Sequence, residues 1–216
     1  MLNLYDTNGT KLDTISKTDF MDGINDLTQL YKRLENIIRF SVMPRVKDQT
    51  VAEHSFCVAF ISLILADIES KVYKKKIDFE GLVRRALCHD IPESFTGDII
   101  FTFKRFGKEF GKTIEGNSLS VVEKALKRIP TCFSKFYFEP TRDCKDSTIE
   151  GQIVNAADLI DAFQYASREV KMGNKYMEAP MQNATRELSS SKLQSVHLFM
   201  EAQHSFGGKD YLGDFK

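Results

Sequence analysis

The sequence predicts an all-α fold, a bundle of five or more helices preceded by a short β-hairpin. Apolar residues recur at helical spacing in several long segments, and no series of alternating, strand-like segments follows residue 18. A chain of 216 residues fits one domain, which buries about 70% of the surface of its unfolded chain. We therefore expect residues 1–18 to form an arm and residues 19–216 to form the helical domain.

The arm carries a hairpin signal. In residues 3–14, NLYDTNGTKLDT, the dipeptide Asn8-Gly9 separates two short alternating segments, a pattern typical of a tight β-turn. Two strands of this length do not form a stable sheet alone. We therefore expect a hairpin that decorates the domain or acts as an ordered arm.

Three helices are predicted in the first half of the chain. Residues 19–40 repeat apolar side chains at helical spacing and predict the first one. Residues 50–72 are apolar on most faces and predict a central helix. Residues 78–90 predict a shorter helix, which begins at the N-cap Asp78 and is ended by Pro92.

The second half is predicted to be helical with one irregular stretch. Residues 118–129 predict a helix, and residues 132–147 predict an aromatic, turn-rich loop. Residues 149–173 predict a long helix that Gly173 ends. Residues 186–206 predict a final helix.

The composition excludes several classes of partner. Lys+Arg and Asp+Glu number 30 each, so no overall positive field favours a nucleic-acid polymer or an anionic membrane, whereas a small anionic substrate needs only a local site. The N-terminus shows no leader pattern, and the apolar stretch at residues 56–66 is too short to span a bilayer. The four cysteines show no C-x-x-C spacing, which favours a reducing compartment. We expect a cytoplasmic protein.

Two histidines fall in the predicted core helices, His54 near the start of the central helix and His89 at the end of the next. Taken singly, each is explained as a hydrogen-bonded core residue. Asp90, however, extends the buried stripe of its helix, and a buried carboxylate is costly unless it is paired or bound to a metal. Glu93 shares a face with His89 if the helix continues that far. An imidazole and two carboxylates therefore surround one buried point.

A further carboxylate, Asp158, interrupts the apolar stripe of the long helix. It is either the partner of a nearby arginine or a metal ligand. With His54, His89 and Asp90 it would complete a set of two nitrogen and two oxygen donors, which suits Mn, Fe, Co or Zn better than Ca or Mg. Asp161 is the alternative ligand on the same helix.

The segments TVAEHS, ALCHDIPESFTGD and NAADLIDA resemble the signature of the HD-domain metal-dependent phosphohydrolases, which is an isolated His, a His-Asp pair and a distant Asp. The separations, 35 residues from His54 to His89 and 68 from Asp90 to Asp158, are most similar to those of the bacterial 5′-deoxynucleotidase (YfbR-like) branch. The resemblance covers residues 27–205. It implies an HD-domain helical bundle in which these four residues bind one divalent metal ion.

The resemblance also assigns catalytic and substrate-binding roles. It implies that Glu93 is the acid/base and water-orienting residue and that Arg39 grips the substrate phosphate. Asp98 matches a carboxylate that reaches the deoxyribose, and Lys104 matches a lysine near the base or the phosphate. Phe40 stands where this branch has a tryptophan, so a smaller aromatic wall is expected there, and selectivity for sugar and phosphate length stays open.

The activity that the resemblance implies is removal of the 5′-phosphate of deoxynucleoside monophosphates by in-line attack of a metal-bound water. The alternatives are a dNTP triphosphohydrolase or stepwise dNTP/dNDP phosphatase of the same superfamily, a nucleotide phosphodiesterase, and a non-catalytic nucleotide sensor. The expected partners are a small-molecule deoxynucleotide and, by the resemblance, further copies of the chain in a homodimer or larger homo-oligomer. Neither a nucleic-acid polymer nor a membrane is expected.

Overall fold

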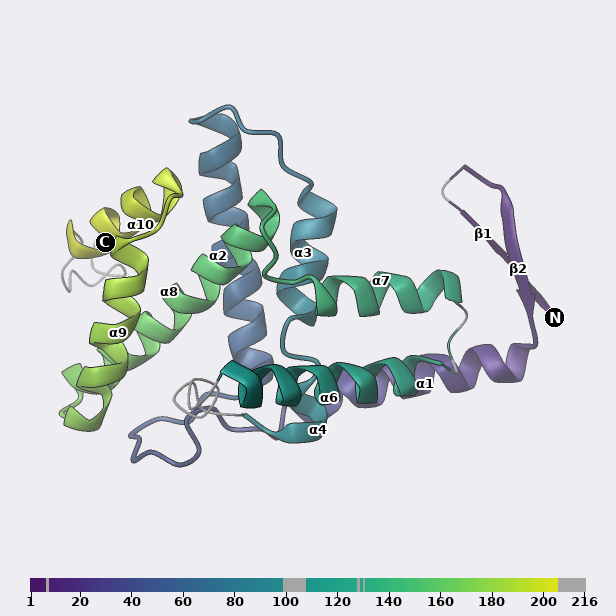
Figure 1. The fold of residues 1–216 in the computed structure, drawn as a ribbon, viewed down its shortest axis with the longest axis horizontal. Coiled ribbons are helices and arrows are strands. Elements are labelled where there is room, and N and C mark those ends of the chain that lie inside the picture. Colours follow the sequence, from purple (N-terminus) through teal and green to yellow (C-terminus); the bar gives the residue numbers. More distant parts are fainter. Residues whose placement is uncertain (7, 99–107, 128, 130, 206–216) are drawn as a thin grey trace, which may run out of the picture.

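The computed structural model describes residues 1–6, 8–98, 108–127, 129 and 131–205. Its elements, labelled as in Figure 1, are mostly α-helices, and the all-α prediction with an N-terminal hairpin is confirmed. They are β1 (Leu2–Tyr5), β2 (Lys11–Ile15), α1 (Lys17–Leu34), α2 (Val51–Lys71), α3 (Phe79–Cys88), α4 (Glu93–Thr96), α6 (Lys108–Leu126), α7 (Thr131–Arg142), α8 (Ile149–Lys171), the 3₁₀ helix η1 (Lys175–Met177), α9 (Glu178–Ser189) and α10 (Gln194–Ser205).

The main hydrophobic core lies where α2, α3 and α8 pack together, and α9 and α10 cover it on one side (Figure 1). Several of its side chains are fully excluded from solvent, among them Val58, Leu65, Leu82 and Ile160. Each such residue contributes about 1.5–3 kcal/mol relative to an exposed position. This packing holds three helices in fixed relation, and the functional side chains project from these helices or from the residues directly after them.

The start of α2 is defined by a capping box. The side chain of Thr50 accepts a hydrogen bond from the backbone N–H of Glu53, and the Glu53 carboxylate accepts one from the backbone N–H of Thr50. Such reciprocal caps satisfy backbone donors that the first turn leaves unpaired. The cap therefore fixes the first turn of α2, which carries His54.

A second, smaller core joins α1, α6 and α7 to the end of α3. It contains Leu30, Cys88, Val122 and Leu126 as buried residues. In Figure 1 these helices extend from α3 on the side opposite to α9 and α10.

The hairpin lies at the far end of α1 (Figure 1). Its strands pair antiparallel, with Leu2 opposite Ile15, and Gly9 in the turn has a φ of 82°, which glycine adopts without strain. Ser16 then caps α1 by accepting a hydrogen bond from the backbone N–H of Asp19.

The first helix is shorter than predicted. It ends at Leu34, whereas the apolar spacing predicted a helix through residue 40. The last apolar residues of that pattern pair with the segment before α2 instead: Ile38 forms an isolated antiparallel bridge with Thr50, and the Ile37 carbonyl accepts a hydrogen bond from the backbone N–H of Val51. This pairing folds residues 35–50 back onto the start of α2.

The loop predicted at residues 132–147 is wrong, because most of it forms α7. Pro140 lies inside the helix, as the third residue from its end, and removes one backbone hydrogen bond, because it has no N–H to donate to the carbonyl of Phe136. Tyr137 and Phe138 pack against the second core, and this burial outweighs the weak helix preference of the aromatic residues.

The prediction of one continuous helix at the end of the chain is also wrong. Residues 186–206 are divided between α9, which ends at Ser189, and α10, which begins at Gln194. The Ser190 hydroxyl donates to the Glu187 carbonyl, and the Ser191 side chain accepts the N–H of Leu193. Serine side chains compete with helical hydrogen bonds in this way.

Helix α2 is long and apolar enough to cross a membrane by length and composition. Ten of its residues are nevertheless buried within the protein, and they include His54 and Glu69. The helix therefore contributes one face to the main hydrophobic core.

Candidate metal centre

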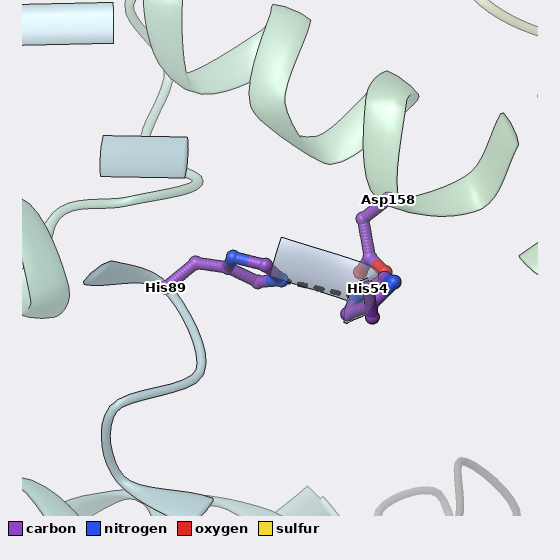
Figure 2. A group of neighbouring side chains, drawn as sticks. All are labelled: His54, His89 and Asp158. Carbon is purple, nitrogen blue, oxygen red and sulfur yellow. Dashed lines mark hydrogen bonds and ion pairs between the residues drawn. The ribbon is translucent and has the colours of Figure 1, made fainter. Parts of the chain in front are cut away.

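Three of the predicted ligands converge from different parts of the core. His54 comes from the first turn of α2, His89 from the residue after α3, and Asp158 from the middle of α8. One donor atom from each of the three lies within 4.8 Å of the others. The Nε2 atoms of the two histidines are 3.2 Å apart, and His54 Nε2 is 3.1 Å from an Asp158 carboxylate oxygen. Figure 2 shows these side chains directed at one point.

Asp90 approaches the same point. Its Oδ2 atom is 3.1 Å from His89 Nε2 and 3.4 Å from His54 Nε2. Both imidazoles are almost fully buried, and the Asp90 side chain is 16% exposed. The structure thus brings together all four residues that the sequence suggested as ligands.

The outward nitrogens of both rings are occupied by acceptors. His54 Nδ1 is 2.6 Å from Asp161 Oδ2, and His89 Nδ1 is 2.7 Å from the Ala86 carbonyl. Such bonds fix the ring orientation and direct the other nitrogen at a metal, as is usual for metal-binding histidines. Two imidazole nitrogens and carboxylate oxygens with fixed outer partners fit a divalent transition metal.

The ionisation of the two carboxylates in the cluster agrees with this interpretation. Burial raises the pKa of Asp158, but the charge of Lys145 and the contacts with His54 and His89 together outweigh burial, so the pKa lies well below its ordinary value. The pKa of Asp90 is lowered against burial by the two histidines. Burial and Arg39 lower the pKa of His54, but Asp158 and Asp161 outweigh them and raise it. The carboxylates are therefore ionised at neutral pH, as metal ligands must be.

Arg39 lies against this cluster from the folded-back segment before α2. Its Nη1 atom donates to Asp161 Oδ2 and to Gln49 Oε1, both at 3.0 Å, and its Nη2 atom is 3.9 Å from Asp158 Oδ1. The side chain is only 11% exposed. The sequence left two roles open for Asp158, partner of an arginine or member of a donor cluster. In the structure Asp158 belongs to the cluster and also lies next to Arg39.

Phe40, the next residue, is held in an unusual backbone conformation. Its φ is 53°, which is uncommon for a bulky residue, and its backbone N–H donates to Asp98 Oδ2 at 2.6 Å. Its ring stacks on Tyr165, with centroids 5.3 Å apart and planes 1° from parallel. The Arg39 guanidinium lies 5.3 Å from the same ring. Asp98 thus holds the segment that carries the aromatic wall.

Glu93 lies at the start of α4 and is buried. Helix α3 ends at Cys88, so His89 and Glu93 do not share a helical face; tight turns join them instead. Lys104 lies outside the described residues.

Two residues at the site were not assigned by sequence reasoning. Asp161 was considered only as a substitute ligand, but it contacts His54 and Arg39 rather than the centre of the cluster. Asp161 follows Asp158 by three residues on the same predicted helix, so the two side chains share a face, and this spacing could have indicated Asp161 from the sequence. Lys145, whose Nζ is 2.5 Å from Asp158 Oδ2, lies between α7 and α8, and its position depends on tertiary structure alone.

Comparison with known proteins identifies the family. A family profile described as 5′-deoxynucleotidase YfbR-like matches residues 26–205. The 5′-deoxynucleotidase PM0747 of Pasteurella multocida is 32% identical, with 68% of this chain and 75% of that protein covered. The 5′-deoxynucleotidase VV1113 of Vibrio vulnificus is 28% identical, with 78% and 87% covered.

Solved structures show the same fold. An HD-domain phosphohydrolase from Listeria innocua superposes with a TM-score of 0.74 at 24% identity, over 86% of this chain and 90% of that one. The PH0347 protein of Pyrococcus horikoshii gives a TM-score of 0.65 at 28% identity, over 85% and 98%. The profile, which matches most of the chain, and the relative at 32% identity show that the chain belongs to the 5′-deoxynucleotidase YfbR-like family.

Proposed function

We propose that this enzyme is a metal-dependent phosphohydrolase that converts deoxynucleoside 5′-monophosphates to deoxynucleosides and phosphate. The observation that carries the proposal is the convergence of His54, His89 and Asp158 beside the Arg39 guanidinium, in a member of this family. A metal site next to a fixed arginine can bind a phosphate group from two sides.

His54, His89, Asp90 and Asp158 are proposed to hold one divalent metal ion, of which Mn, Co, Fe and Zn suit the donors best. A metal bound there would lower the pKa of a coordinated water and withdraw charge from the phosphoryl group. The protein's contribution is a set of donors held in place by Asp161 and the Ala86 carbonyl.

Arg39 is proposed to bind the phosphate oxygens. Asp161 and Gln49 both accept from its Nη1 atom, so the guanidinium is oriented before the substrate arrives. A guanidinium held in this way binds phosphate without a further entropic cost for its own ordering.

Glu93 is proposed to orient the attacking water or to transfer the proton of the leaving group. Its buried position after the His-Asp pair supports this role. Phe40, Asp98 and Lys104 are proposed to contact the rest of the substrate. For Asp98 the bond to the Phe40 N–H supports an additional role, which is to hold the aromatic wall toward the sugar.

The test is a substrate panel of dNMPs, NMPs and dNTPs with the purified protein loaded with Mn²⁺ or Co²⁺. We expect inorganic phosphate from dNMPs and loss of turnover when EDTA removes the metal. Release of tripolyphosphate from dNTPs, without activity on dNMPs, would contradict the proposal and favour a triphosphohydrolase. Glu93→Ala should keep the metal and lose turnover, and a variant that loses the metal would show that Glu93 has another role.

We also propose that the protein works in the cytoplasm as a homodimer or larger homo-oligomer. Free thiols at Cys57, Cys88 and Cys144 support a reducing compartment. The exposed apolar side chains of Phe56 and Phe60 on α2, which are 65% and 59% accessible, support self-association. Light scattering after gel filtration measures the oligomeric state, and a monomer at working concentrations would contradict this part of the proposal.

A further inference from the structure

Lys145 brings a second cation to the metal centre, from a segment that no other site residue occupies. It lies between α7 and α8, and its Nζ atom is 2.5 Å from Asp158 Oδ2. A lysine ordinarily carries a positive charge at neutral pH, and this contact places that charge directly against the Asp158 carboxylate.

Asp158 lies between two cations that differ in accessibility. Arg39 is 3.9 Å from Oδ1, while Lys145 contacts Oδ2. The Arg39 side chain is 11% exposed and is held by Asp161, whereas the Lys145 side chain is 32% exposed. Lys145 is thus the more accessible of the two, and an ammonium on a four-carbon chain can turn toward a ligand more easily than a fixed guanidinium.

The charges in contact at the site make Lys145 decisive for anion binding. Asp90, Asp158 and Asp161 carry three negative charges, and Arg39 and Lys145 carry two positive ones. A divalent metal ion turns this net charge of minus one into plus one. Without Lys145 this group of side chains and its metal ion would be one charge less positive and would attract a phosphate dianion less strongly.

We infer that Lys145 is the second phosphate-binding cation of this site and acts together with Arg39 on the phosphate of the substrate. The inference rests on the proposed function, because it assumes that a phosphate group binds at the metal centre. A residue that only positioned Asp158 would affect metal binding and phosphate binding alike, whereas a phosphate-binding cation would not. The charge of Lys145 repels a metal ion and attracts phosphate, so its removal should change the two affinities differently.

The experiment measures the affinities of Mn²⁺ and of inorganic phosphate by isothermal titration calorimetry, with phosphate titrated into Mn²⁺-loaded protein. Lys145→Met should weaken phosphate binding about tenfold or more, with Mn²⁺ affinity unchanged or raised. Lys145→Arg keeps the charge and should restore most of the phosphate affinity. The matched control is Lys71→Met, because Lys71 is also paired with an aspartate, Asp67 at 2.6 Å, but is 74% exposed on α2; it should change neither affinity.

Each other outcome overturns the inference. Phosphate binding by Lys145→Met equal to that of the wild type removes Lys145 from the phosphate site. A parallel loss of Mn²⁺ and phosphate affinity shows a structural role instead. If Lys145→Met does not fold, Lys145→Gln answers the same question. Absence of phosphate binding and of dNMP hydrolysis in the wild type contradicts the proposed function itself, whereas normal wild-type binding with an unaffected variant contradicts only the role of Lys145.

Discussion

Helix α8 carries buried and half-buried carboxylates in two regions that have different kinds of partner. In its middle, Asp158 and Asp161 face ionisable groups: two histidines, an arginine and a lysine lie around them. Near its end, Glu169 is fully buried, but it accepts hydrogen bonds from the backbone N–H groups of Val46 and Lys47 and from the side-chain amide of Asn174.

The partners of a buried carboxylate therefore indicate its role better than its burial does. Backbone amides do not change charge near neutral pH, so the bonds from Val46 and Lys47 to Glu169 tie the segment before α2 to α8. The groups around Asp158 are side chains that can also bind a metal ion. A neutral His54 can coordinate a metal through Nε2, the nitrogen that faces the Asp158 carboxylate, so both residues can bind the same ion. Structural and functional carboxylates share one helix and are separated by about three turns.

The largest expected effect is at the centre of the helix. Asp158→Asn removes a charged donor and leaves Lys145 without its partner, so Mn²⁺ affinity should fall by about 100-fold or more, and activity should be lost with it. Calorimetric titration with Mn²⁺ measures this. Wild-type affinity in the variant would mean that Asp158 is not a ligand and that this half of the comparison is wrong.

Asp161→Asn should weaken Mn²⁺ binding by about 10- to 100-fold, the usual effect of losing a partner of a ligating histidine. The amide can still accept a hydrogen bond from His54 Nδ1 but no longer neutralises Arg39. The same titration measures it, and Asp161→Glu is the matched control for charge. An Asp161→Asn variant that binds Mn²⁺ normally but melts at a lower temperature would place Asp161 with Glu169, among the structural carboxylates.

Glu169→Gln should lower the free energy of unfolding by about 1–3 kcal/mol, because buried backbone donors lose a charged acceptor, while Mn²⁺ affinity stays at the wild-type level. Hydrogen bonds hold the pKa of Glu169 below its ordinary value even though burial raises it. Its stabilisation is therefore present above the pKa of the unfolded chain and is lost as the pH falls through the lower folded pKa.

Urea unfolding of both proteins at several pH values measures this effect. The difference between wild type and Glu169→Gln should be constant near neutral pH and should shrink in acid, below about pH 4.3. A difference that grows in acid, or a loss of metal affinity, would contradict the structural role of Glu169.

Tyr165 lies between the two regions and should give the smallest effect. Its hydroxyl donates to the Lys47 carbonyl at 2.7 Å, and its ring stacks on Phe40. Tyr165→Phe removes only the hydrogen bond, so stability should fall by about 0.5–1.5 kcal/mol, with unchanged KM for dNMP. Thermal unfolding and steady-state kinetics measure the two quantities, and a raised KM would show that the hydroxyl also affects the substrate pocket.

The sequence predicted which side chains would cluster at one point better than it predicted the elements between them. His54, His89, Asp90 and Asp158 lie in strongly periodic helices or directly after one, where polar residues on a buried stripe are conspicuous. Helix α7 was missed because Pro140 and the aromatic residues gave a local signal that tertiary packing overrode.

Residues in irregular segments were the least predictable from sequence. Lys145 and the bond between Asp98 and the Phe40 N–H depend on how loops return to the core, and no local spacing encodes that. Asp161 was within reach of the sequence, because it shares a helix with Asp158, but its hydrogen bond to His54 crosses 107 positions of the chain.

The distribution of the proposed ligands over α2, α8 and the turn after α3 would also link metal binding to the folding equilibrium. A metal ion bound at this point joins segments that are far apart in the unfolded chain and bind it only once they have docked. By mass action, such a ligand stabilises the native state by about 2.7 kcal/mol when its free concentration is 100 times its dissociation constant. The melting temperature of the protein should therefore report on metal supply, so that a cell depleted of the metal would hold an enzyme that is both inactive and easier to unfold and degrade.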